Sequence, residues 1–324
     1  MAIIDLMSIE GQKISEDINS YTTLIYGTPK VGKTTFLTSL YDKERTLLIA
    51  TEKGYKALPG VKVQDCGNWS MFMQIVKQLE NPKVKEKFDV VIIDTIDLLY
   101  RYAKRFVLGK HSVDKLSDVA WGEGWSDFDT ALFEGINRIE KAGYTLAFIS
   151  HANSKTEKDP ITGVEFDKYY PTAKKQVFEI VYKMVDNIVF AGMTKDEDGK
   201  EQRILYTRES QQFLAGSRFK HMKTNLPLDP EVYKNALREA VQAEGKGNIK
   251  KEREVAYIEN ETLDFDIIMK ELNGVATKLH KEGKLNLLTS IIDKRLGVGA
   301  KVKDCKPEQV EVIKIILDEV KSSM

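Results

Sequence analysis

Residues 21–40 read YTTLIYGTPKVGKTTFLTSL, and they decide how the rest of the chain is interpreted. Residues 22–26 form a short apolar and β-branched run, which is typical of a buried strand. Residues 27–34 match G-x-x-x-x-G-K-[ST] at every fixed position, and residues 35–40 can continue as a helix. A strand, a glycine loop and a helix in this order predict a loop that binds phosphate groups.

Each fixed residue of this loop has a chemical reason. Gly27 and Gly32 allow a tight turn whose N–H groups surround a β-phosphate. Lys33 can reach the β- and γ-phosphates, the Thr34 hydroxyl can ligate Mg²⁺, and the following helix directs its free N–H groups at the same anion. The predicted nucleotide-binding residues are Gly27, Thr28, Pro29, Lys30, Val31, Gly32, Lys33, Thr34 and Thr35.

The composition is that of an ordinary globular protein. The 324 residues are 42% hydrophobic, and 49 basic residues balance 49 acidic ones, so any site for a polyanion must be a local patch. Cys66 and Cys305 lack CxxC spacing and the four histidines stand far apart, which predicts unpaired thiols in a reducing compartment and no zinc site. The acidic N-terminal segment and the lack of a long apolar run predict neither a signal peptide nor a membrane span.

Residues 88–94 read FDVVIID and predict a buried parallel strand that ends in an acid. The Asp94 carboxylate would emerge at the carboxyl edge of the sheet, where ligands bind in open α/β folds. There it could hold Mg²⁺ through water beside Thr34. The alternative is a turn residue that merely ends the strand.

Residues 144–150 predict a further buried strand, with His151 at its tip facing the γ-phosphate; a histidine satisfied in a loop is the alternative. The polar segment 153–176 interleaves lysines with aromatic rings, a combination that suits single-stranded nucleic acid. An ordinary charged hairpin turning at Thr162-Gly163 explains it equally well. The candidate DNA-binding residues are Lys155, Lys168, Tyr169, Tyr170, Lys174 and Lys175.

The second half of the chain predicts mainly structure. Residues 187–191 and 203–207 predict an antiparallel hairpin, after which Arg208 or Arg218 could reach a neighbouring subunit's γ-phosphate. Residues 110–125, rich in glycine and tryptophan, predict a loop with little regular structure.

The predicted domains are an ATPase domain at 1–243 with its core at about 20–225, a linker at 244–261 and a helical module at 262–324. The module should contain three helices, at 263–282, 285–296 and 307–321.

Four motifs together resemble the RecA superfamily of ATPases: GTPKVGKT, Glu52 two residues beyond the strand LLIA, VVIID ending at Asp94, and FISH ending at His151. The chain looks more narrowly like phage-encoded RecA-like proteins of single-strand annealing and recombination. The resemblance covers about residues 20–225 and implies a RecA-like α/β core with a mainly parallel central sheet. It also implies DNA-binding loops near 110–125 and 153–175.

The resemblance further implies a mechanism. Glu52 would polarise the attacking water, although it could instead be a plain surface acid, and His151 would sense the γ-phosphate where RecA itself usually has a glutamine. With Lys33 these would be the catalytic residues, and Thr34 and Asp94 the ligands of Mg²⁺.

The implied protein hydrolyses ATP with Mg²⁺ and acts on single-stranded DNA in recombination or annealing, as a ring or filament in the cytoplasm of a bacterial host. A single-strand-binding protein would be a further partner, and no membrane would be involved. A helicase-like or loader-like DNA ATPase, and a nucleotide-gated DNA-binding module with negligible turnover, remain as alternatives. A small-molecule kinase is disfavoured because no arginine-rich lid is visible.

Overall fold

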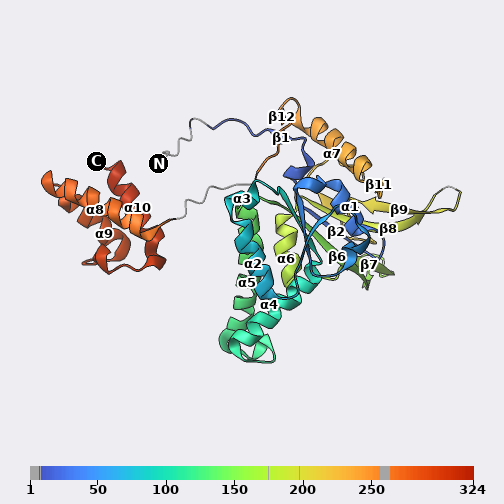
Figure 1. Ribbon diagram of the computed structural model, residues 1–324, viewed down its shortest axis with the longest axis horizontal. Helices are drawn as coiled ribbons and strands as arrows, with labels where there is room; N and C mark the ends of the chain where they lie inside the picture. Colours follow the sequence, from blue (N-terminus) through green and yellow to red (C-terminus); the bar gives the residue numbers. More distant parts are fainter. Residues whose placement is uncertain (1–6, 8, 174, 197, 256–262) are drawn as a thin grey trace. The chain divides into compact units, whose positions relative to one another are not determined.

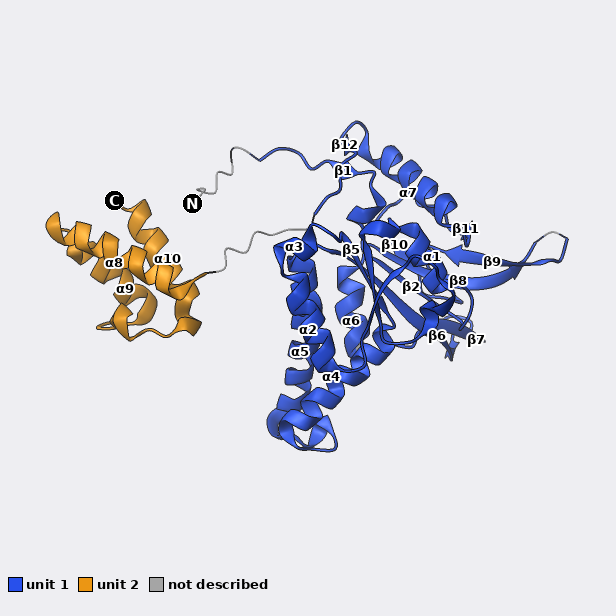
Figure 2. Cartoon of the chain, in the orientation of Figure 1, with its two compact units in different colours: residues 1–257 blue, residues 258–324 orange. Residues whose placement is uncertain are grey.

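The computed structural model describes residues 7, 9–173, 175–196, 198–255 and 263–324. The chain divides into two compact units, Met1–Tyr257 and Ile258–Met324 (Figure 2). The first unit contains the phosphate loop and the central sheet. The second unit is helical.

The central sheet has ten strands, in the order β11-β9-β8-β2-β6-β5-β3-β4, with β10 paired to β8 and β7 paired to β6. The parallel strands are β2 (Thr23–Gly27), β3 (Thr46–Ala50), β4 (Lys62–Asp65), β5 (Val90–Asp94), β6 (Thr145–Lys158) and β8 (Asn187–Lys195). The antiparallel strands are β7 (Glu165–Pro171), β9 (Glu201–Tyr206), β10 (Gly216–Ser217) and β11 (Asn225–Pro227).

The register of the parallel strands gathers the motifs at one edge of the sheet. Gly27 is aligned with His151 on β6 and with Ala191 on β8. Asp94 is aligned with Ala50 on β3, two residues before Glu52. The phosphate loop and the three polar residues of the motifs therefore lie together at the carboxyl ends of neighbouring strands.

Helices cover both faces of the sheet (Figure 1). One core contains residues of α1 (Lys33–Leu40) and α7 (Pro230–Gly245), packed against side chains such as Ile25 and Ile92. The opposite core contains residues of α2 (Trp69–Leu79), α4 (Ile96–His111), α5 (Glu123–Lys141) and α6 (Lys175–Met184), packed against Tyr26 and Ile93. A mainly parallel sheet between two helical layers confirms the predicted α/β fold class.

The prediction that residues 110–125 form a loop with little regular structure is wrong. Helix α4 runs to His111, two 3₁₀ turns follow at Leu116–Asp118 and Ala120–Gly122, and α5 begins at Glu123. Leu116 is buried beside Gly124, where an added Cβ would stand 2.6 Å from the Leu116 carbonyl oxygen. Gly124, one of the glycines that suggested a loop, is required because the 3₁₀ turn at Leu116 packs too closely on α5 to leave room for a Cβ.

Most of the expected linker belongs to the first unit. Strand β12 (Ile249–Lys250) pairs in parallel with β1 (Ile14–Ser15), and Arg253 donates hydrogen bonds to the carbonyl oxygens of Asp89 and Gly143 and to Thr145 Oγ1. The polar and glycine-containing composition suggested a spacer, but a half-buried arginine fixes this stretch to the strand ends. Residues 256–261 of the expected linker lie outside the described residues.

The second unit has a core of its own. Helices α8 (Phe265–Lys281), α9 (Leu285–Leu296) and α10 (Val310–Ser322) bury apolar side chains such as Leu272, Leu288 and Leu317 against one another. The three predicted helices are present, and a 3₁₀ turn at Pro307–Gln309 precedes the third. In neither unit does a described helix have the length and hydropathy to cross a membrane.

Candidate functional site

The phosphate loop joins β2 to α1, and its glycines are required by geometry. A Cβ on Gly27 would stand 2.2 Å from the carbonyl oxygen of Ala191, and Gly32 has φ 111° where it caps α1. The Lys33 amino group lies inside the loop and donates to the carbonyl oxygens of Gly27 and Thr28, both at 2.9 Å. Burial lowers the pKa of Lys33. The loop thus presents a pre-positioned cation at the place where a β-phosphate would bind.

The predicted metal ligands are in contact. The Thr34 hydroxyl donates to Asp94 Oδ2 at 2.8 Å, and a Cβ on Gly54 would stand 3.7 Å from both of these oxygens. Burial raises the pKa of Asp94 to about 6, while the Thr34 hydrogen bond and the Lys33 charge oppose the shift. One hydroxyl and one carboxylate, with Gly54 and its lack of a side chain beside them, fit Mg²⁺, which takes few protein ligands and completes its shell with water and phosphate.

Glu52 lies beside this pair. Its backbone N–H donates to the Asp94 carbonyl oxygen at 3.2 Å, and its Oε1 accepts a hydrogen bond from the Thr95 hydroxyl at 3.1 Å. His151 Nε2 is 3.4 Å from the same Oε1. The structure therefore brings together Glu52 and His151, two residues that are 99 positions apart in the sequence. A partly exposed carboxylate held in this way can orient a water molecule.

Asp97 is a residue that the sequence analysis missed. Its carboxylate accepts hydrogen bonds from the Ser150 hydroxyl at 3.1 Å, from the His151 N–H at 3.1 Å and from the Thr172 hydroxyl at 2.9 Å. A cavity of about 320 Å³ lies here, lined by residues that include Glu52, Asp97, His151 and Thr172. The available signal was an acid in the first turn of the helix that follows Asp94. Its partners could not be read from spacing, because they lie on β6 and after β7.

The candidate DNA-binding segment is a β-hairpin. Strand β6 continues past His151 to Lys158 and pairs with β7, with Asn153 opposite Tyr170 and Lys155 opposite Lys168. Opposed residues of an antiparallel pair share a face and successive residues alternate. Lys155, Lys168 and Tyr170 therefore lie on one face of the hairpin, and Tyr169 lies on the other.

Several of these side chains already have partners within the chain. Lys168 forms an ion pair with Glu209 at 2.9 Å and is only 14% exposed. The ring of Tyr169 stacks on Phe190 with centroids 5.3 Å apart, which gives this tyrosine a packing role. The Tyr170 hydroxyl donates to a carboxylate on the facing strand, Glu157, at 2.6 Å.

Lys155 is exposed, with its ammonium 5.6 Å from the Tyr170 ring centroid. Lys174 lies outside the described residues, and Lys175 begins α6 without a described side chain.

The two arginines proposed to act across a subunit interface are engaged within their own chain. The Arg208 guanidinium donates to the carbonyl oxygens of Ser217, Phe219 and Lys220. Arg218 lies 3.4 Å from Asp186, which accepts a hydrogen bond from the Thr22 N–H at the amino end of β2. Arg208 therefore stabilises a turn, and Arg218 lies at the sheet edge opposite the phosphate loop.

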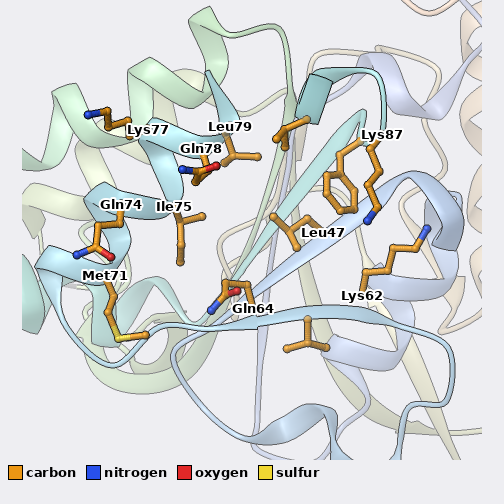
Figure 3. A pocket seen from close by; sticks show the side chains of 13 residues that line it. Leu47, Lys62, Gln64, Met71, Gln74, Ile75, Lys77, Gln78, Leu79 and Lys87 are labelled. Carbon is orange, nitrogen blue, oxygen red and sulfur yellow. The ribbon is translucent and has the colours of Figure 1, made fainter. Parts of the chain in front are cut away.

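A second cavity, of about 640 Å³, opens beside the edge of the sheet that β4 forms. Figure 3 shows Leu47 near Lys62 and Lys87, with Ile75 on the facing helix α2, next to the edge strand β4. It shares no lining residue with the phosphate loop or with the cavity at Glu52. The nucleotide site is therefore distinct from this groove.

A glycine loop between a parallel strand and a helix, with a threonine and a strand-end aspartate in contact beside it, defines a P-loop NTPase. Comparison with known families agrees, since residues 19–219 match an AAA domain, and the chain belongs to this family. Over its full length it is similar to the SPbeta prophage-derived uncharacterized protein YorG of Bacillus subtilis (strain 168). The two are 30% identical over 328 residues, covering 98% of each chain. The protein is thus a P-loop ATPase-family protein with a prophage relative.

Proposed function

We propose that the protein hydrolyses ATP in the presence of Mg²⁺ and that single-stranded DNA controls this reaction. The observation that carries the proposal is the continuity of β6, which contains His151 at the nucleotide site and Lys155 in the exposed hairpin. At the same base of the hairpin, just beyond the end of β7, the Thr172 N–H donates to the His151 carbonyl oxygen at 2.8 Å. A shift of His151 on nucleotide binding would therefore move both strands of the hairpin.

The chemistry assigned to each residue follows from its position. Mg²⁺, when bound, would neutralise negative charge that develops on the phosphate groups. Thr34 and Asp94 would hold the ion, and Lys33 would contact the phosphates from within the loop. Glu52 would orient the attacking water in line with the γ-phosphate, and the His151 imidazole, beside Glu52, would contact the γ-phosphate.

The RecA-like character of the protein is part of this proposal. The candidate water-orienting acid follows β3, whereas the metal-binding aspartate ends β5 and is followed by Thr95. This placement supports the RecA-type arrangement, in which the glutamate comes from the strand beside the one that ends in the aspartate. Action on single strands in phage recombination or annealing, as an oligomer and with a single-strand-binding protein in a host cytoplasm, extends the same proposal.

The test is ATP hydrolysis by the pure protein with and without single-stranded DNA. We expect stimulation by DNA, and we expect Glu52→Gln to lower turnover about a hundredfold or more while ATP still binds, because only transition-state stabilisation is lost. Lys33→Ala should instead lose nucleotide binding. Hydrolysis that does not respond to DNA would contradict the coupling, and normal ATP affinity of Lys33→Ala would contradict the assignment of the loop.

A second candidate function is a nucleotide-gated DNA-binding protein with negligible turnover. It is favoured by the hydrogen bond between Glu52 and Thr95, which holds the carboxylate away from full exposure. Under this alternative Glu52→Gln would bind DNA as the wild type does, with and without ATP, and the wild type would hydrolyse ATP no faster than the variant.

A further inference from the structure

Arg203 lies against the phosphate loop in the same chain. It is on β9, and its Nη1 is 3.5 Å from the position that a Cβ on Gly32 would occupy. Leu228 also contacts this position at 3.0 Å, and its N–H donates to the Arg203 carbonyl oxygen at 3.1 Å. Strand β9 at Arg203 and the segment after β11 are therefore fixed beside the N-terminus of α1.

The Arg203 guanidinium has no ion pair with any acid in the described part of the chain, and the residue is exposed. This separates it from Arg208, whose guanidinium donates to three carbonyl oxygens, and from Arg218, which pairs with Asp186. An unpaired arginine at a phosphate-binding loop is suited to bidentate contact with a phosphate group.

The sheet order shows which end of a nucleotide Arg203 would meet. Asp94 ends β5, His151 lies on β6 and Glu52 follows β3, and all three of these strands lie on one side of β2. Strand β9 lies on the other side of β2, beyond β8. If the γ-phosphate faces the first group, the rest of the nucleotide leaves the loop towards β9.

We propose that Arg203 binds the α-phosphate, the phosphate group next to the nucleoside, of a nucleotide held in the phosphate loop of the same chain. The inference rests on the proposed nucleotide site and adds a binding residue to it. Because ADP and ATP both carry the α-phosphate, Arg203 should contribute equally to their affinities. It should have little influence on turnover at saturating ATP, since its contact is the same in the ground state and the transition state.

The experiment measures the affinities of the full chain for ADP and ATP by calorimetry, with Mg²⁺. Arg203→Ala should weaken both about tenfold or more, the effect of losing a charge-assisted hydrogen bond to phosphate. Arg203→Lys keeps the charge but loses the planar guanidinium, so its affinities should lie between those of the wild type and of Arg203→Ala. The matched control is Lys195→Ala, which removes an exposed cation from the facing strand of the same hairpin and should change neither affinity.

The outcomes separate this inference from the proposed function. If Arg203→Ala binds ADP within about twofold of the wild type while Lys33→Ala does not bind, the assignment of Arg203 is wrong and the loop stands. If Arg203→Ala weakens the binding of ATP far more than the binding of ADP, the guanidinium contacts the γ-phosphate, and the assignment of Arg203 to the α-phosphate is wrong. If Lys33→Ala binds as the wild type does, the nucleotide site itself is wrong.

Discussion

Asp89 holds together the chain segments at the amino edge of the sheet. Its carboxylate forms ion pairs with Arg45 and with Arg253, the latter at 3.1 Å. The hydrogen bond from Arg45 is the main cause that lowers the pKa of Asp89, and the nearby Arg253 charge adds to it. Because the folded-state pKa lies below the unfolded one, the ionised carboxylate stabilises the fold above pH of about 4, and this stability is lost as pH falls through the folded pKa.

We therefore expect Asp89→Asn to lower the free energy of unfolding by about 1–3 kcal/mol at pH 7, since it leaves two arginines without their anion. The difference from the wild type should shrink towards pH 3. Urea unfolding at both pH values measures it. Asp114→Asn, at an exposed position, is the control and should match the wild type at both values. Equal midpoints for Asp89→Asn and the wild type at pH 7 would show that the cluster contributes nothing.

Asp97 is a positioning residue by its contacts, because it joins the first turn of α4 to both strands of the hairpin through His151 and Thr172. Asp97→Asn keeps the size of the side chain and changes its acceptor pattern. We expect basal ATP hydrolysis to stay within about threefold of the wild type, while most of the stimulation by single-stranded DNA is lost. Thr172→Val should reproduce the effect in part. Full stimulation in both variants would mean that the hairpin does not communicate through this carboxylate.

Among the elements, the β6–β7 hairpin offers the sharpest test of DNA binding. Lys155 and Lys158 are exposed on it, whereas Lys168 is paired with Glu209. Replacing Lys155 and Lys158 with alanine should weaken binding to single-stranded DNA and reduce the salt dependence by about one ion per lost phosphate contact. Fluorescence anisotropy over a range of salt concentrations measures the slope.

The matched control for that variant removes the same charge from the β8–β9 hairpin, at Lys195 and Lys200, which are also exposed. Its affinity and salt slope should equal those of the wild type. If the two double variants lose affinity equally, the effect is one of net charge alone, and the β6–β7 hairpin is not the interface.

The elements also show how far the sequence could be interpreted. Strong local signals were sufficient for the phosphate loop, for the strand ending at Asp94 and for the helix at 285–296, whose predicted bounds match α9. Local patterns could not show that β6 continues from the core to Lys158, because a polar strand outside the sheet has no apolar periodicity.

The same limit explains the residues that were missed. Arg203 meets Gly32, and Asp97 meets Thr172, through the order and register of strands that are distant in sequence. The stretch at 244–255 appeared to be a spacer because its composition is polar and contains glycine. Arg253 fixes it through partners near residues 19, 89 and 143, which are too distant in sequence for a local pattern to show. Motif spacing predicts which residues can do chemistry, but it does not predict which long-range contacts the topology will create.

At the scale of the whole molecule, the two units have separate hydrophobic cores. The nucleotide residues all belong to Met1–Tyr257, and the second unit, Ile258–Met324, is a three-helix module. Units with separate cores unfold separately unless a large apolar interface joins them. A ligand stabilises only the unit that binds it, by a free energy that grows with the logarithm of its concentration.

We therefore expect calorimetry of the full chain to show two unfolding transitions, one for each unit. Saturating Mg²⁺-ADP should raise the Tm of the nucleotide-binding unit, Met1–Tyr257, and leave the other Tm unchanged. A fragment of residues 1–257 should unfold at the Tm of that transition and bind ADP with the affinity of the full chain. The control is Lys33→Ala, in which ADP should move neither transition. A single transition that shifts as a whole with ADP, or a fragment that no longer binds nucleotide, would show that the helical module is energetically part of the nucleotide-binding unit.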